Sequence, residues 1–502
     1  MTERAAGTTW LPGLRELLLA IFFLSCLSPV VDYDVWLHLA SGRAMCESGQ
    51  VLRTDVFSHT VPGKGWVYHE WLAAVLTYLV WKAAGINGLI LAKAAMMTAS
   101  MALLLAAFEQ RGYGRGAAPV LALLAAMVAS RNVALERPHL FTILFLTAFV
   151  YWLERQRARG TPLPWGMAAV VVVWANVHGG FILGLLAFGP FLVEDLWLLA
   201  RLWSESEEGK GNPAGGAARA GDAGPRATAR VRRSLAVLAA CIGAALINPY
   251  GLETLLYPLQ YARPSAALGQ IDEWASPNFQ RQLVLEAVLL LLAAALMRSR
   301  RRVGLADGIF VLASAHLILT GARNSFLVGP FLGPAAVEHL ASALEQGELP
   351  KRLARKVLEL DRGLFGPLLL VTVLVGGFWV VGQPPRLAPG RFPVEAVEWL
   401  RKERPAGRLF NEYDMGGYLM FNLPEYPVFV DGRVDVYSAH GAFDEFLSVW
   451  RLTPRWAEVL ERRGVGVVLL ERRQSLAALL SVAKGWRLAH RDDVAAVFVR
   501  VP

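Results

Sequence analysis

The feature that most constrains this chain is a series of apolar blocks, each close to the length needed to cross a bilayer. A bilayer core of about 30 Å is spanned by a helix of roughly 17 to 25 apolar residues. Because lipid offers no hydrogen-bond partner to open backbone groups, each block is expected to be a helix. The clearest blocks lie near 11–31, 67–84, 86–108, 117–132, 138–153, 164–178, 181–203, 234–247, 282–298, 303–322, 325–343 and 364–383. The pattern predicts a mainly α protein, a polytopic transmembrane bundle of about 11–13 helices.

Composition agrees with a membrane protein and argues against a nucleic-acid partner. The 502 residues are 55% hydrophobic and 18% charged, a balance unusual for a water-soluble globule. The net charge of +9 comes mainly from short loops between the apolar blocks, where basic residues act as topology signals. Cys26, Cys46 and Cys241 show neither metal-ligand nor disulfide spacing, so they imply no chemistry. The first block lacks a cleavage site and is expected to be a retained helix.

Basic loops set the expected orientation of the chain. Arginines at 298–302 and basic residues at 351–356 should face the cytoplasm, as should the linker 204–233, which is expected to be disordered. The loops 32–66 and 248–281 then lie on the outer face, together with the C-terminal segment. If Arg155, Arg157 and Arg159 are also cytoplasmic, the blocks between 86 and 153 have the wrong parity, so one block should be broken or re-entrant.

The last part of the chain differs from the rest. Residues 1–383 form the expected transmembrane domain, and 384–502 are expected to form a small extracytoplasmic α/β domain. Short apolar runs at 428–430 and 465–470 alternate with stretches of helical spacing at 394–403 and 455–463.

The densest polar constellation follows the first apolar block directly. Asp32 and Asp34 precede a stretch whose apolar side includes Trp36, which is expected to anchor an interfacial helix at the membrane surface. Two carboxylates at such a surface suit a general base that deprotonates a hydroxyl, or a divalent cation held against a phosphate. The alternative is that both aspartates only cap the interfacial helix and favour its dipole.

The order of features after the first helix carries a family resemblance. It consists of Asp32 and Asp34, a short helix ending in Cys46-Glu47-Ser48-Gly49, the turn Pro62-Gly63, the helix entry Tyr68-His69, and AAGINGLILAKAA at 83–95. In this order and spacing, the stretch 32–95 resembles the first outer loop and second helix of polytopic GT-C glycosyltransferases. That superfamily includes protein O-mannosyltransferases and lipid-linked aminoarabinose transferases.

The resemblance implies roles for several residues. Asp32 or Asp34 would be the acidic catalytic residue, and either would be the ligand if a metal is bound. His69 stands where the family often has Lys or His before two prolines. Here Glu70 follows His69 and the prolines are absent, which makes Glu70 a further candidate for substrate binding.

Other ionisable residues lie at the ends of apolar blocks, where burial of charge is costly and a binding site is the working hypothesis. Arg137 and Arg323 are candidates for binding the phosphate of a lipid donor. The alternative is that each snorkels to the interface. His178 is a candidate substrate ligand, although the following glycines equally suggest a turn.

Two further acidic groups lie outside the apolar blocks. Asp272 and Glu273 precede Trp274 in the loop 248–281, a combination that suits sugar contact, although ordinary turns also explain it. In the C-terminal domain, the segment Asp431-Gly432-Arg433 is a candidate substrate loop, and the favoured alternative is a turn with a surface salt bridge.

The sequence therefore predicts a membrane glycosyltransferase of a bacterial inner membrane that uses a polyprenyl-phosphate sugar donor and an unidentified acceptor at the outer face. No soluble cofactor is implied, and a divalent cation is one option. The alternatives are a non-catalytic scaffold in envelope polysaccharide assembly and, third, a transporter.

Overall fold

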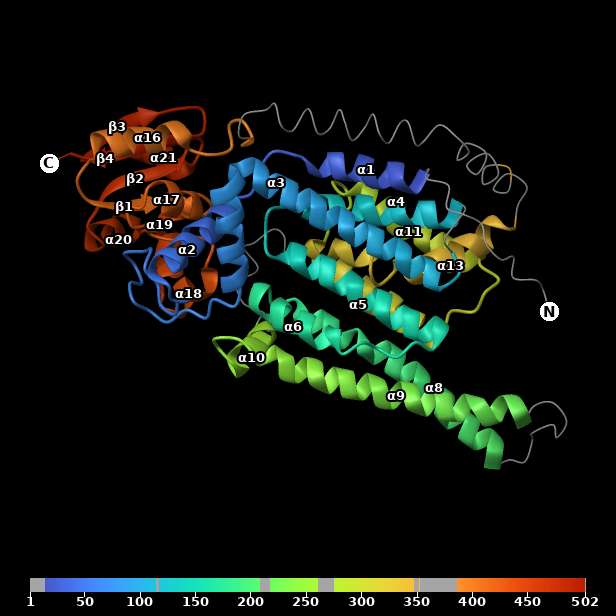
Figure 1. Ribbon diagram of the computed structural model, residues 1–502. Coiled ribbons are helices and arrows are strands. Elements are labelled where there is room, and N and C mark those ends of the chain that lie inside the picture. Colours follow the sequence, from blue (N-terminus) through green and yellow to red (C-terminus); the bar gives the residue numbers. More distant parts are fainter. Residues whose placement is uncertain are drawn as a thin grey trace.

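The computed structural model describes residues 14–113, 117–207, 217–260, 275–346, 352 and 386–501. Figure 1 shows an elongated helical bundle with a small α/β domain at one end. The helices of the bundle and its end loops are α1 (Leu14–Cys26), α3 (Trp71–Gln110), α4 (Ala117–Ser130), η1 (Arg131–Val133), α5 (His139–Arg159), α6 (Gly166–Val177), α7 (Phe181–Leu186), α8 (Phe188–Glu207), α9 (Ala217–Ala245), α10 (Leu252–Gln260), α11 (Leu283–Arg298), α12 (Leu305–Thr320), η4 (Ala322–Val328) and α13 (Gly333–Leu344). The block 364–383 lies outside the described residues.

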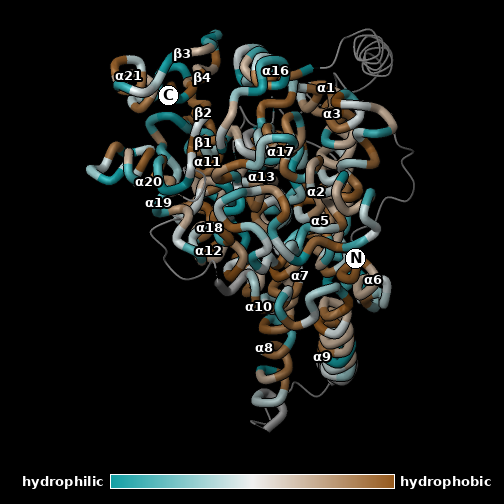
Figure 2. The backbone as a smooth tube through the Cα atoms, turned by 90° about the vertical axis from the view of Figure 1, so that its left-hand side faces the viewer, coloured by the Kyte–Doolittle hydropathy of each residue, from teal (hydrophilic) through white to brown (hydrophobic). Residues whose placement is uncertain are grey.

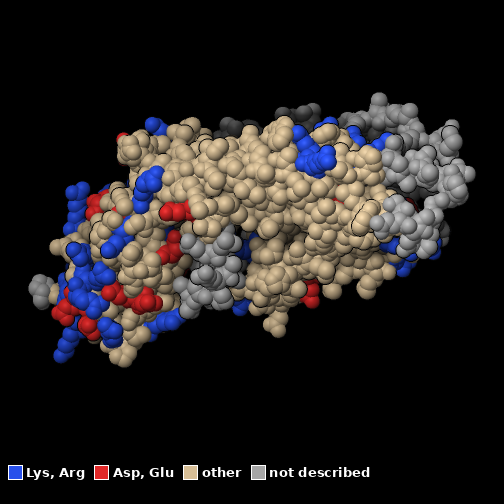
Figure 3. Space-filling view, turned by 90° about the horizontal axis from the view of Figure 1, so that it is seen from below, with Lys and Arg blue, Asp and Glu red and all other residues tan. Residues whose placement is uncertain are grey.

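Membrane-spanning character is clear for part of this bundle. Within the described residues, Trp71–Gln110 and Phe181–Ser204 are long and apolar enough to cross a membrane, and the bent pair Ala322–Val328 and Gly333–Leu344 adds a third candidate. Other apolar helices are shorter, such as Ala117–Ser130 and Leu305–Thr320. Figure 2 shows α8 as apolar along most of its length, and Figure 3 shows few charged side chains along the bundle compared with the end that carries the α/β domain.

The long helix α3 contains two of the expected spans. Gly85 interrupts it with φ 63° and ψ −157°, a conformation open essentially only to glycine. Figure 1 shows that the first half runs across the end of the bundle, whereas the second half runs along it. The ring of Trp81 in the first half lies 4.9 Å from that of Phe421 in the C-terminal domain. The end of the block 67–84 thus packs against the C-terminal domain.

The expected disorder of the linker 204–233 is wrong for its described ends. Helix α8 continues to Glu207, and α9 begins at Ala217. Arg230 pairs with Asp195 of α8, and the guanidinium of Arg233 lies 4.2 Å from the ring centroid of Trp165. These ion-pair and cation–π contacts favour helix over coil in a stretch that lacks hydrophobic periodicity.

The α/β domain is built on a four-stranded sheet of order β1-β2-β4-β3. Strand β1 (Arg408–Asn411) pairs in parallel with β2 (Val465–Glu471), and β4 (Ala495–Arg500) is antiparallel to both β2 and β3 (Trp486–Arg491). Six residues of β2 are buried, as expected for a central strand covered on both faces. The surrounding helices are α16 (Val394–Glu403), α17 (Gly416–Asn422), α18 (Val434–Ala439), α19 (Ala442–Trp450), α20 (Trp456–Arg462) and α21 (Ser475–Leu480).

The loop 32–66 packs into this domain. Its helix α2 (Asp34–Ser48) lies against α17, where a Cβ on Gly417 would stand 3.0 Å from the backbone nitrogen of Leu37. Trp36 is 4% exposed and packs against Phe392 and Tyr418. The expectation that Trp36 anchors the chain in the membrane surface is therefore wrong, because the ring anchors the C-terminal domain.

A buried ion cluster fastens the same loop. Arg433 pairs with Asp55 of the loop at 2.7 Å and with Asp431 at 2.6 Å, and its guanidinium lies 4.6 Å from the ring centroid of Trp66. The Arg433 side chain is 3% exposed and the side chains of both aspartates are 0% exposed. The expected surface salt bridge between Asp431 and Arg433 is thus buried, because the loop 32–66 covers it.

Candidate active site

The end of the bundle beneath the C-terminal domain brings together Asp32, Asp34 and Arg137. The Arg137 guanidinium binds both oxygens of Asp32 at 2.6 Å, and its Nη1 lies 3.3 Å from Oδ2 of Asp34. Asp32 lies between α1 and α2, and Arg137 lies just before α5, so the fork joins the first outer loop to the bundle. A bidentate fork is a strong, directional form of ion pair.

The two aspartates have different environments. The Asp32 side chain is 5% exposed and held by the fork, whereas that of Asp34 is 38% exposed. The guanidinium of Arg137 lies between the carboxylates, where a shared cation would otherwise sit. Asp34 is therefore the better candidate for contact with an acceptor, and the pair is poorly arranged as a metal site.

Helix capping accounts for these aspartates only in part. The N-cap of α2 is Tyr33, and no side-chain cap hydrogen bond forms there. Asp34 lies in the first turn of α2, where its charge favours the helix dipole. Asp32 takes no part in the cap.

A second polar group surrounds Glu70, the N-cap residue of α3. Its carboxylate lies 3.9 Å from Nε2 of His38, 3.8 Å from Nε2 of His69 and 3.6 Å from Nε2 of His178. The three imidazoles come from α2, from the residue before Glu70 and from the turn after α6. The chain thus brings His69, Glu70 and His178 together, and His38 is a member that sequence reasoning missed.

His178 has a defined hydrogen-bond pattern. Its Nδ1 accepts from the backbone N–H of Gly180 at 3.0 Å and lies 2.7 Å from the Thr142 hydroxyl. Because Nδ1 is an acceptor toward Gly180, the Thr142 hydroxyl donates its proton to it, and the same hydroxyl accepts from the indole of Trp174 at 2.8 Å. A Cβ at Gly180 would clash with Thr142, which explains a glycine here. The turn and the ligand interpretations of His178 are therefore compatible.

Burial shifts the proton equilibria of this group. It raises the pKa of Glu70 to about 8, with Asp34 acting in the same direction, and Arg323 and Arg137 acting against it. It lowers the pKa of His69 to about 4 and that of His38 to about 3. Near neutral pH the histidines are uncharged and Glu70 is largely protonated, so this group is polar without being ionic.

Arg323 and Asp435 also act on this centre. Arg323 lies in η4 and, through its charge, opposes the rise in the Glu70 pKa, whereas Asp435 of α18 adds to it. Asp435 accepts a hydrogen bond from Tyr257 at 3.0 Å, and the ring of Tyr257 lies 4.2 Å from that of His69. The predicted Asp272 and Glu273 lie outside the described residues.

A buried ion pair beside the Asp32 fork was also missed. Lys93 of α3 pairs with Glu136 at 2.6 Å, with side chains 1% and 3% exposed, and its ammonium donates to Ser28. Because Glu136 precedes Arg137, this pair fixes the segment that presents the fork. A lysine inside an apolar run was the sequence signal that could have found it.

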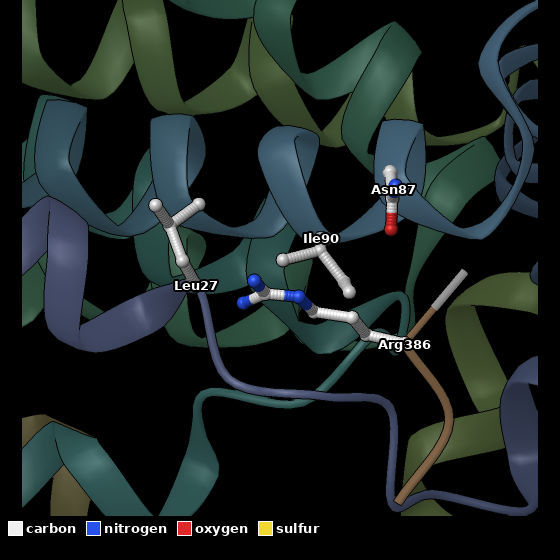
Figure 4. Close-up of a pocket in the computed structure, with 4 residues that line it drawn as sticks. All are labelled: Leu27, Asn87, Ile90 and Arg386. Atoms are coloured by element: carbon white, nitrogen blue, oxygen red, sulfur yellow. The ribbon is translucent and has the colours of Figure 1, made fainter. Parts of the chain in front are cut away.

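Two other features lie elsewhere in the described chain. Glu395, His490 and Asp492 of the C-terminal domain offer ligand atoms within 4.8 Å of one another, and His490 pairs with Asp492 at 3.4 Å. Figure 4 shows a small pocket between α1, α3 and the start of the C-terminal domain, lined by Leu27, Asn87, Ile90 and Arg386. Neither includes a residue of the Asp34 and Glu70 groups.

Similar folds occur in two solved membrane enzymes. The oligosaccharyltransferase of Archaeoglobus fulgidus in the apo form matches with a TM-score of 0.58 and 11% identity, over 91% of this chain and 69% of that chain. ArnT from Cupriavidus metallidurans, bound to undecaprenyl phosphate, matches with a TM-score of 0.51 and 14% identity, over 97% and 96%. The same oligosaccharyltransferase tethered with an acceptor peptide gives a TM-score of 0.55 at 11% identity, over 91% and 68%.

These matches define the class of fold. The solved structures are GT-C glycosyltransferases, so the chain has a GT-C fold and the resemblance drawn from residues 32–95 is confirmed at that level. No protein-family model and no curated protein matches the sequence.

Proposed function

We propose that this chain is a membrane glycosyltransferase that moves a sugar from a polyprenyl-phosphate carrier to an acceptor at the outer face of a bacterial inner membrane. One observation carries the proposal. In a GT-C fold, the half-exposed carboxylate of Asp34 is fixed beside Arg137 at the end of the bundle that faces the C-terminal domain.

The chemistry assigns Asp34 as the general base. Its carboxylate takes the proton of the acceptor hydroxyl as the oxygen attacks the anomeric carbon. The bond from that carbon to the phosphate oxygen breaks with inversion, and its electron pair leaves on the polyprenyl phosphate. Arg323 and Arg137 stabilise the phosphate charge by electrostatic attraction. Asp32 holds Arg137 in place and is a positioning residue.

The ligands of the similar structures support the choice of substrates. ArnT was crystallised with undecaprenyl phosphate, and the oligosaccharyltransferase with a tethered acceptor peptide. For this chain we propose a lipid-phosphate donor and an acceptor bound on the exposed side of Asp34, next to the C-terminal domain. A Cβ at Gly432 of that domain would lie 3.0 Å from Oδ1 of Asp34, so the domain borders the reacting carboxylate.

Substitution of the aspartates tests the assignment. The protein is purified into nanodiscs and incubated with synthetic undecaprenyl-phosphate sugars and membrane acceptors, and released undecaprenyl phosphate is measured by mass spectrometry. D34N should lose activity by a factor of about 10² or more while it keeps its thermal stability. D32N should lose both, because it breaks the fork on Arg137. D444N, on the exposed surface of α19, is the matched control and should behave as wild type.

A non-catalytic scaffold is the competing proposal. It requires no convergence of Asp34, Arg137 and Glu70, and it predicts that the purified wild type releases no undecaprenyl phosphate from any donor. Full transfer by the double variant D32N/D34N would rule out the base assignment.

A further inference from the structure

The distances between the Glu70 carboxyl oxygens and the neighbouring imidazole nitrogens suit the binding of a small ligand group. Its carboxylate stands 3.6 to 3.9 Å from three imidazole Nε2 atoms. These separations exceed a direct hydrogen bond of about 2.7 to 3.2 Å. An oxygen atom of a ligand, placed beside the Glu70 oxygen and one imidazole Nε2, can lie within hydrogen-bond distance of both atoms. The group therefore offers places for small oxygen groups instead of closing on itself.

The hydrogen bonds of His178 determine which of its ring nitrogens can donate to a ligand. Gly180 N–H and the Thr142 hydroxyl both donate to Nδ1, so the proton of a neutral His178 is on Nε2. Nε2 lies 3.6 Å from Oε1 of Glu70, which supplies a carboxyl oxygen. A hydroxyl group is both donor and acceptor, so it satisfies this pair with its two functions.

The pair is accessible to a ligand. The side chains of Glu70, His69 and His178 retain 20%, 15% and 16% of their surface, whereas His38 retains 5%. His38 is further held by Tyr68, whose hydroxyl lies 2.8 Å from its Nδ1. Glu70, His69 and His178 are thus the more exposed members of the group, and His38 is its buried member.

The group is also the wrong kind of site for a phosphate. A His69 pKa of about 4 leaves that imidazole neutral at physiological pH, so it contributes little to offsetting phosphate charge. Arg137 and Arg323, both of which act on Glu70 through their charge, are the cations of this region. The polar, uncharged side of the site is suited to the sugar, and the cationic side to the phosphate.

We propose that Glu70, His69 and His178 bind the hydroxyl groups of the donor's sugar, and that Thr142 is a positioning residue that fixes His178 for this contact. The assignment rests on the proposed function for its place in a reaction. Binding itself is measured without turnover, so failure of the subsite and failure of the transferase proposal are distinguishable.

The first experiment compares two ligands on the full-length protein in nanodiscs. Undecaprenyl phosphate has no sugar, whereas undecaprenyl-phosphate glucose and arabinose carry a hexose and a pentose. For E70A and H178A, the affinity for the better of the two sugar-linked ligands should fall at least tenfold, while that for undecaprenyl phosphate stays within twofold of wild type. An equal loss for both ligands would assign the group to the phosphate or lipid, and no loss for either would remove it from the donor site.

A second measurement needs no variant and so does not depend on folding. Singly deoxygenated versions of the better sugar are tested for binding to the wild-type protein. Because a site built for a hydroxyl rejects the analogue that lacks it, one deoxy position should lose at least tenfold in affinity. Equal affinity for every deoxy sugar overturns the proposal.

The positioning role of Thr142 has a matched control on the same helix. T142V removes the donor to His178 and should weaken sugar-linked donor binding several-fold, whereas T142S restores it. Thr147, buried in α5, donates only to the backbone carbonyl of Ile143 among the contacts described for it, so T147V should bind as wild type. If T142V and T147V lose affinity equally, the effect is one of helix packing, and the positioning role is contradicted.

Discussion

At the scale of single residues, three carboxyl groups that are close in the sequence differ in their contacts and exposure. Asp32 is committed to the fork of Arg137, Asp34 keeps exposed surface, and Glu70 lies among neutral imidazoles. Asp32, Asp34, His69 and Glu70 lie in one stretch of the sequence, so they could be predicted as candidate catalytic or substrate-binding residues. The sequence alone could not pair Asp32 with Arg137, which is 105 residues away, because no local pattern encodes such a contact.

The raised pKa of Glu70 has a consequence for stability. A carboxyl whose folded pKa of about 8 exceeds its ordinary 4.5 holds a proton that the unfolded chain releases, so its contribution is lost as pH rises toward 8. His69, whose folded pKa of about 4 lies below its ordinary 6.5, adds a slope of opposite sign around pH 6.5, but it adds the same slope in E70Q. From pH 6.5 to 8 the wild type should lose about 2 kcal/mol that E70Q does not lose. Thermal unfolding of both proteins across this range measures the difference, and parallel curves would contradict it.

At the scale of elements, the apolar blocks predicted helix positions well where a block is one straight helix. The blocks 138–153, 282–298 and 303–322 correspond to α5, α11 and α12. The boundary between the blocks 67–84 and 86–108 falls at Gly85, where α3 changes direction. The block pattern failed at 217–233, where ion-pair and cation–π contacts with distant residues support a helix.

Gly85 provides the test at this scale. G85A forces a side chain into a backbone region that only glycine occupies readily, and it should cost about 1–3 kcal/mol. Because straightening α3 would move Glu70 away from His178, sugar-donor binding should fall as well. G243A is the control, since a Cβ there meets no atom within 4 Å. Equal thermal stability of G85A and G243A would show that the bend is not required.

At the scale of the whole molecule, the C-terminal domain and the loop 32–66 form one packed unit on the end of the bundle. R433M should destabilise this unit by about 3–5 kcal/mol, because it leaves Asp55 and Asp431 buried without their cation. R472M removes an exposed pair with Asp493 and should cost nothing measurable. Thermal unfolding of the two variants measures this difference. Similar melting temperatures would contradict the claim that the buried cluster holds the loop 32–66 to the C-terminal domain.

The proposed orientation is testable through one natural thiol. Cys46 is exposed in α2, whereas Cys26 and Cys241 are buried. A membrane-impermeant maleimide should label wild type but not C46S in intact spheroplasts. On a C46S background, S204C near the end of α8 should be labelled only after lysis. The opposite pattern would place the C-terminal domain in the cytoplasm.

The central claim is that the chain removes sugar from a lipid phosphate. The most direct measurement is the release of undecaprenyl phosphate by purified wild-type protein from a panel of undecaprenyl-phosphate hexoses and pentoses, with membrane acceptors present and D34N as the matched inactive form. The account predicts time-dependent release from at least one donor by the wild type and loss of that release in D34N. Absence of release from every donor, or equal release by both proteins, would contradict it.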